Sequence, residues 1–62
     1  METLGERLRW ARKRLGWSQE RLSEESNVKQ GTISKIERGD QSRTSYVTEL
    51  ATALVVSPHW LA

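Results

Sequence analysis

The residues best suited to binding chemistry in this 62-residue chain follow one another between Lys29 and Arg38. The carboxamide of Gln30 donates and accepts hydrogen bonds at once, which matches the paired donor and acceptor on the edge of an adenine base. Lys35 carries a cation able to reach guanine O6 and N7. At helical periodicity, one face carries small, polar or cationic residues: Gly31, Ser34, Lys35 and Arg38. The opposite face carries Ile33, Ile36 and Glu37. The pattern predicts a helix that turns one face to a core and the other to a ligand.

Two short helices joined by a tight turn, within residues 18–39, are the elements that must position this face. Leu22 is the apolar residue of the first helix, and Ser26 is small enough to let another helix come close. Asn27 enters the left-handed conformation with little penalty, so the chain is able to reverse there. Val28 then fills the corner. The stretch is typical of a helix-turn-helix.

The start of the chain predicts a capped helix. Thr3 and Glu6 have the spacing of a capping box, so the helix begins near Leu4. Gly16 lies where a left-handed residue ends a helix. An apolar stripe faces the core: Leu4, Leu8, Ala11 and Leu15. Trp10 points away from the stripe and either covers the C-terminal segment or lies exposed.

The region after residue 39 predicts a loop and two further helices. A fourth helix begins near Thr44 or Ser45, and Ser57-Pro58 reads as the cap and first-turn proline of a short fifth helix. The core residues expected of the fourth helix are Tyr46, Val47, Leu50, Ala51 and Leu54. Val55 follows this fourth helix, where it must either avoid positive φ or bear strain.

The length indicates one small domain, residues 1–62, and the helical patterns described above predict an all-α class. A chain of this size buries only about 60% of the surface that it exposes when unfolded, so its stability margin is thin. The absence of cysteine excludes disulfides and thiolate metal sites and fits the cytoplasm. Neither a membrane-spanning run nor a signal peptide is present in the sequence. The net charge of +2 is a weak argument for nucleic acid by itself.

An enzyme is not expected, because no nucleophile, acid–base pair, metal cluster or cofactor loop has usable spacing. His59 stands without a second histidine, a cysteine or clustered carboxylates, so it is not expected to bind metal. We expect no cofactor and no small-molecule ligand.

The chain resembles the DNA-binding domain of lambdoid phage repressor and Cro proteins and their bacterial, XRE-like relatives, from about Leu4 to Leu61. The matching residues are Ser18-Gln19, Gln30, Ile33-x-x-Ile36-Glu37-x-Gly39, Glu49-Leu50-Ala51-x-Ala53-Leu54 and Ser57-x-x-Trp60-Leu61. The resemblance implies a compact five-helix fold of the lambda-repressor type, with its third helix in the DNA major groove. It also implies an apolar, core position for Trp17.

The resemblance assigns roles to individual residues. Gln19, in the first turn after the cap Ser18, corresponds to a glutamine that holds a DNA phosphate. Gln30 is the expected base reader, and Lys29 is a candidate for phosphate or guanine. The remaining candidates for DNA binding are Gly31, Thr32, Ser34, Lys35, Arg38, Arg43 and Thr44. Arg38, Arg43 and Thr44 belong to a segment that follows the DNA backbone in the family.

Three residues depart from the family pattern, and a fourth fits its expected surroundings poorly. Asn27 replaces a glycine, and Lys29 replaces a Ser or Thr cap, which leaves the third helix without an obvious side-chain cap. Val55 replaces another glycine, and Asp40 fits a DNA-facing loop poorly.

The resemblance also implies an ion pair between Arg12 and Glu37. Glu37 lies on the inward face of its helix and Arg12 at the margin of the first apolar stripe, so we predict a structural pair rather than two solvated charges. Removing one partner of a buried pair typically costs about 3 to 5 kcal/mol.

The expected function is that of a sequence-specific transcriptional regulator. The resemblance implies a repressor that binds a pseudo-palindromic operator as a homodimer, with half-sites about 34 Å apart. The alternative is a helix-turn-helix module for protein contact, such as an antitoxin subunit. The polar outward face of the third helix favours DNA, because a protein-binding face would show exposed aliphatic or aromatic anchors.

Overall fold

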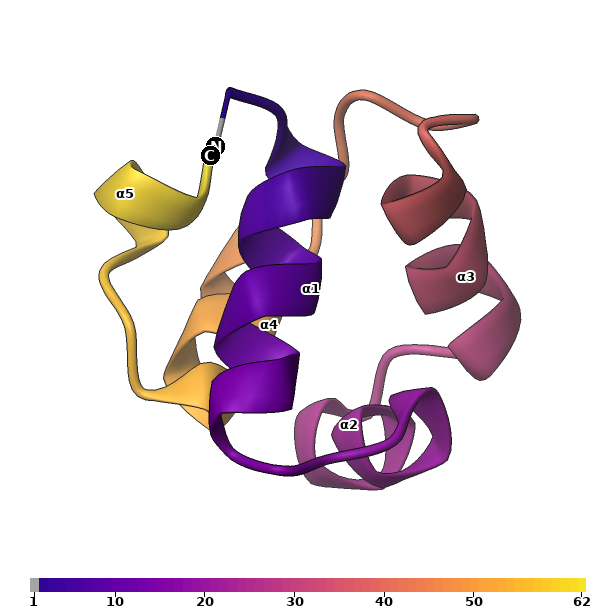
Figure 1. Cartoon of the computed structure of the whole chain (residues 1–62), viewed down its shortest axis with the longest axis vertical. Helices are drawn as coiled ribbons and strands as arrows, with labels where there is room; N and C mark the ends of the chain where they lie inside the picture. The colour runs from indigo at the N-terminus through magenta and orange to yellow at the C-terminus, as the bar shows by residue number, and fades with distance from the viewer. Residues whose placement is uncertain (1) are drawn as a thin grey trace.

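The computed structural model describes residues 2–62, and all regular secondary structure within them is helical. The five helices are α1 (Leu4–Arg14), α2 (Gln19–Ser26), α3 (Gln30–Arg38), α4 (Val47–Leu54) and α5 (Pro58–Leu61). In Figure 1, α1 stands between α3 and α5, with α4 behind it and α2 across the base. The predicted all-α, five-helix fold is confirmed.

Local sequence signals set most of the helix ends. Thr3 and Glu6 form the predicted capping box, in which the Glu6 amide donates to Thr3 Oγ1 at 3.1 Å and the Thr3 amide donates to Glu6 Oε1 at 3.2 Å. Ser18 and Ser57 cap α2 and α5 through their hydroxyl oxygens. Gly16, with φ of 73°, turns the chain after α1. These ends therefore follow from capping residues in the sequence.

The capping box also affects Glu6 itself. Amide donors from Glu2 and Thr3 lower the pKa of the Glu6 carboxyl, because they stabilise its ionised form. Because the pKa is lower in the folded state than in the unfolded state, the ionised carboxyl contributes to the stability of the fold, and this contribution is fully present above the ordinary pKa of glutamate. It is lost as the pH falls through the lowered value.

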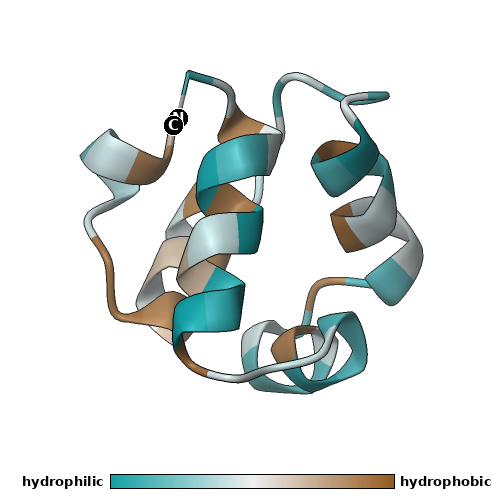
Figure 2. Ribbon diagram, viewed as in Figure 1, coloured by the Kyte–Doolittle hydropathy of each residue, from teal (hydrophilic) through white to brown (hydrophobic). Residues whose placement is uncertain are grey.

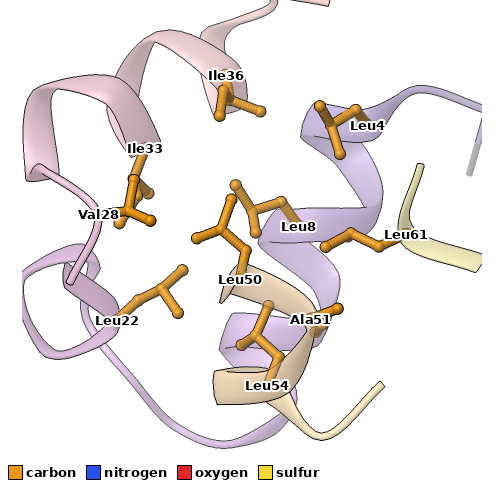
Figure 3. Close-up of a cluster of buried hydrophobic side chains, with 11 residues drawn as sticks. Leu4, Leu8, Leu22, Val28, Ile33, Ile36, Leu50, Ala51, Leu54 and Leu61 are labelled. Carbon is orange, nitrogen blue, oxygen red and sulfur yellow. The ribbon is translucent and has the colours of Figure 1, made fainter. Parts of the chain in front are cut away.

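One hydrophobic core joins all five helices (Figure 3). Leu8 of α1 and Leu50 of α4 are fully buried at its centre, with Leu22 of α2, Ile33 of α3 and Leu61 of α5 pointing toward them. In Figure 2, α1 turns mostly hydrophilic residues toward the viewer, whereas α4 behind it is largely hydrophobic or near neutral. Hydrophobic burial thus fixes how α3 is held against the remainder of the fold.

Two predictions of core residues are wrong. Leu15 is 38% exposed because α1 ends at Arg14, and the chain turns away from the core at the cap. Tyr46 is 44% exposed because it precedes α4 instead of lying within it. Trp17 is half-buried and packs against the core.

The C-terminal residues resolve two open alternatives. Val55 takes the left-handed conformation, with φ of 58° and ψ of 45°, and is 81% exposed. For a β-branched residue this conformation carries strain of about 1 to 2 kcal/mol. Trp10 does both things foreseen for it, since it packs edge to face on Trp60 at 5.7 Å between ring centres and stays 45% exposed.

Helices α1 and α3 approach each other closely at Gly5, a buried residue of α1. A Cβ atom on Gly5 would lie 3.2 Å from the Ile36 carbonyl carbon and 3.3 Å from Glu37 Cα, and it would overlap the Ile36 carbonyl oxygen. The lack of a side chain is therefore what lets α1 and α3 pack this closely.

Candidate nucleic-acid interface

Helix α3 has two chemically different faces. Ile33 and Ile36 are fully buried and anchor the helix to the core. The candidate binding residues lie on the accessible side: Lys29, Gln30, Gly31, Lys35 and Arg38 are exposed, and Thr32 and Ser34 are half-buried. The candidates of residues 29–38 are therefore accessible, and the spacing of Gly31, Ser34, Lys35 and Arg38 places these four on the side of α3 away from the isoleucines.

The turn before α3 sets the direction of this helix. Asn27 adopts the predicted left-handed conformation, with φ of 62°, and its amide donates to the Ser23 carbonyl at 2.9 Å. The buried hydroxyl of Ser26 donates to the Leu22 carbonyl at 2.7 Å and accepts from the Val28 amide at 3.2 Å. Val28 is 2% exposed and fills the corner. Small polar side chains and one apolar plug thus fix the angle between α2 and α3.

The first turn of α3 is open to a ligand. Lys29 occupies the cap position without a side-chain hydrogen bond, as its sequence position predicts. A Cβ atom on Gly31 would meet no atom within 4 Å. The glycine is therefore not required by packing, and it leaves space at the surface where a base edge or the backbone of a duplex could approach.

The predicted ion pair between Arg12 and Glu37 is present and buried. Arg12 Nε donates to Glu37 Oε2 at 2.8 Å and Nη2 donates to Oε1 at 2.9 Å. The third guanidinium nitrogen, Nη1, donates to the Trp17 carbonyl at 2.7 Å. The side chains of Arg12 and Glu37 are only 10% and 5% exposed. The hydrogen bonds with Glu37 raise the pKa of Arg12 above its usual value, while burial opposes them.

Gln19 is joined to the same network. Its Nε2 donates to Glu37 Oε1 at 3.2 Å, so the side chain is held against α3. An amide nitrogen has two hydrogens, and this bond uses one of them. The half-buried Gln19 therefore keeps a donor and its carbonyl oxygen for another partner.

Arg43 and Thr44 lie in the segment between α3 and α4. Arg43 is exposed, and both residues line a shallow cavity of about 400 Å³ together with Leu4 and Val47. The expected start of α4 near Thr44 or Ser45 is wrong, since the helix begins at Val47. The Thr44 hydroxyl instead accepts from the Tyr46 amide at 3.1 Å, and this bond forms a turn before the helix.

Arg38 is paired at the end of α3. Its Nε donates to Asp40 Oδ2 at 3.0 Å, and its Nη1 lies 3.5 Å from Ser34 Oγ. The sequence alone gave Asp40 no role, although its place two residues after an arginine was a usable signal. Glu37 as an acceptor for Gln19 was also missed, because the two residues are far apart in the sequence.

Other kinds of site are not seen in residues 2–62. No group of three or more His, Cys, Asp or Glu side chains within this range is arranged to hold a metal ion. In the same residues no helix is long and apolar enough to cross a membrane. The accessible face of α3 and the segments beside it are the candidate interface.

Residues 8–61 match a family described as helix-turn-helix. The chain is 42% identical, over all 62 residues, to HTH-type transcriptional regulators for the conjugative elements R391 of Providencia rettgeri and SXT of Vibrio cholerae. It spans 29% of the length of these relatives.

Solved structures agree with these sequence matches. The restriction-modification controller protein C.AhdI from Aeromonas hydrophila is 35% identical, with a TM-score of 0.85 over 95% of this chain and 91% of that one. The DNA-binding domain of the P22 C2 repressor is 33% identical, with a TM-score of 0.86 over 97% of this chain and 80% of that one. These relatives are named as regulators, a controller and a repressor rather than as enzymes. By sequence and by fold, the chain belongs to the helix-turn-helix family of XRE-like, lambda-repressor-like domains.

Proposed function

We propose that residues 1–62 form the DNA-binding module of a sequence-specific transcriptional regulator, with α3 in the major groove of the duplex. The observation that carries this proposal is the division of α3 into a buried face and a polar, cationic face. Ile33 and Ile36 hold the helix in place, and the exposed face offers amide and cationic donors that suit bases and phosphates. The named regulators and repressors among its relatives support the same role.

We assign different tasks to different parts of this interface. Gln30 is proposed to read a base, and Gln19 to hold a phosphate with the donor left free by Glu37. Phosphate, sugar or base contacts are proposed for Lys29, Gly31, Thr32, Ser34, Lys35, Arg38, Arg43 and Thr44. The amides at the start of α4 add neutral donors beside Arg43.

Repression by a homodimer is part of the proposal. Two copies of α3 would enter successive major grooves of a pseudo-palindromic operator, with half-sites about 34 Å apart. A bound dimer would then block polymerase on DNA in the cytoplasm. The C-terminal segment 55–62 carries no Asp, Glu, Lys or Arg and includes the exposed Val55. These features suit it to packing against the same segment of a second protomer.

Selection of bound sites from a pool of random duplexes tests this function directly. We expect enrichment of a pseudo-palindromic sequence whose halves repeat at one helical turn. The experiment reports DNA binding, symmetry and spacing together. A pool without any enriched sequence would exclude the proposed function.

Gln30→Ala should reduce discrimination at one or two base pairs of each half-site. A bidentate amide contact is typically worth about 1 to 3 kcal/mol against a wrong base, which is roughly 5- to 150-fold in affinity. Competition between the selected site and single-base variants measures this loss. Equal weakening on the selected site and on random DNA would contradict the base-reading role.

Arg43→Ala should weaken all DNA sequences alike, by about three- to tenfold near 0.1 M salt. Each phosphate contact releases counterions, so the slope of log K against log salt should become shallower by about 0.9. Titrations of one duplex at several salt concentrations measure the slope. An unchanged slope would show that Arg43 does not touch the DNA backbone.

A further inference from the structure

A single exposed carboxylate lies in the cationic segment that forms the proposed interface. Between residues 29 and 48 the acidic residues are Glu37 and Asp40. Glu37 is buried and neutralised by Arg12. Asp40 therefore contributes the exposed negative charge in a segment that also carries Lys29 and Lys35.

The backbone at the end of α3 determines where the Asp40 carboxylate lies. Gly39 turns the chain with φ of 85°, and its amide donates to the Ile36 carbonyl at 3.1 Å. The Asp40 amide then donates to the Lys35 carbonyl at 2.9 Å. Crossed bonds of this kind close a helix around a left-handed residue. The backbone of Asp40 is thus tied to the last turn of α3, and its side chain starts beside Arg38.

The pair that results occupies a specific edge of the arginine. Arg38 Nε and Nη2 both lie 3.0 Å from Asp40 Oδ2. This is an edge with which a guanidinium also grips a phosphate. Nη1 lies 3.5 Å from Ser34 Oγ, so the guanidinium is directed back along the surface of α3.

The other cations of the interface differ from Arg38. In the described part of the chain, Lys29, Lys35 and Arg43 make no ion pair and no side-chain hydrogen bond. They can meet phosphates without first giving up a partner. Arg38 must give up Asp40, and Asp40 would in addition repel any phosphate that approaches.

We propose that Asp40 competes with DNA phosphates for Arg38 and so lowers the sequence-independent part of the affinity for DNA. This inference rests on the proposed function, because it concerns the same interface. The carboxylate takes the place of a phosphate in the free protein, so binding exchanges one anion for another at Arg38. The net gain from that arginine is small on any sequence.

Asp40→Asn tests the inference, with binding to the selected site and to a scrambled duplex measured at several salt concentrations. We expect binding of both duplexes to tighten by about three- to tenfold near 0.1 M salt. The slope of log K against log salt should steepen by about 0.9 on each, because the phosphate contact of Arg38 is then no longer offset by the release of a carboxylate. Unchanged slopes would overturn the inference.

Glu25→Gln is the matched control. Glu25 is also exposed and also pairs with an arginine of its own helix, since Arg21 Nε lies 3.0 Å from its Oε2, but this pair belongs to α2. Its removal changes the net charge by the same amount, and we expect less than a twofold effect and no change of slope. Equal effects of Glu25→Gln and Asp40→Asn would reduce the observation to net charge and overturn the inference.

A second comparison isolates Arg38. In an Arg38→Met background, Asp40→Asn should no longer steepen the slope, and a slope that still steepens would contradict the competition. The same measurements distinguish a failure of the proposed function from a failure of this inference. Wild-type protein that binds both duplexes equally would exclude sequence specificity while the effect of Asp40→Asn stays measurable on each. Wild-type protein that binds neither would overturn both proposals.

Discussion

Glu37→Leu is expected to lower the free energy of unfolding by about 3 to 5 kcal/mol. The substitution leaves the guanidinium of Arg12 with one of its partners, the Trp17 carbonyl, in a place where its side chain is only 10% exposed. A buried charge without its counter-charge keeps the cost of desolvation and loses the attraction that offset it. Urea denaturation followed by circular dichroism measures the change.

Two further variants separate burial from charge in this prediction. Arg12→Met/Glu37→Leu removes both charges and should recover most of the lost stability, since a matched apolar pair is often neutral or stabilising. Glu25→Gln breaks an exposed pair and should cost less than about 1 kcal/mol. A Glu37→Leu protein as stable as the Glu25→Gln protein would show that the Arg12 pair is not effectively buried.

Gly5→Ala is expected to destabilise the fold by about 3 kcal/mol, the upper end of the usual range for overpacking. The added methyl would overlap the Ile36 carbonyl oxygen, and it would crowd Glu37 Cα at 3.3 Å. The obstacle is backbone, so α1 and α3 must separate as whole helices. The better helix propensity of alanine, worth about 1 kcal/mol, offsets only part of the cost. Chemical denaturation again provides the measurement.

Gly31→Ala is the natural control, because Gly31 is also a helical glycine. A methyl there meets nothing within 4 Å, so we expect stabilisation by about 1 kcal/mol. The two substitutions should therefore have opposite signs. A destabilised Gly31→Ala protein, or an unaffected Gly5→Ala protein, would contradict the packing described for these helices.

The helix ends that the sequence predicted well are those determined by a few neighbouring residues. Thr3, Ser18 and Ser57 act through hydrogen bonds within their own first turns, so each could be placed without knowledge of the fold. The left-handed turn at Asn27 is equally local. The start of α4 was misplaced because the helix has no side-chain cap, and the Thr44 hydroxyl forms a turn that precedes the helix.

Errors in the predicted core arise where periodicity was extended past a helix end. Leu15 and Tyr46 fit an apolar stripe by spacing alone, but each lies just outside its helix and points partly to solvent. Gly5 was missed for a different reason. Its importance depends on the backbone of α3, more than 30 residues away, and the only local signal was a glycine in a helix where alanine would be favoured.

In the candidate interface, too, some features could be predicted from the sequence and others depend on the folded structure. The exposed face of α3 followed from periodicity, and the Arg12 pair followed from the family resemblance. The bond from Gln19 to Glu37 and the pairing of Arg38 with Asp40 depend on the placement of side chains after folding. The first could not be derived from spacing, and the second had only the separation of two residues as a signal, although both determine which donors remain free at the surface.

The contact at Gly5 has a mechanical consequence for how a duplex would be bound. Because the backbones of α1 and α3 are in close contact at this point, α3 has little room to change its orientation. The burden of induced fit would then fall on the nucleic acid, whose bending and twisting cost different amounts for different base steps. A rigidly held α3 would favour DNA sequences that deform easily, even at base pairs that no side chain reaches.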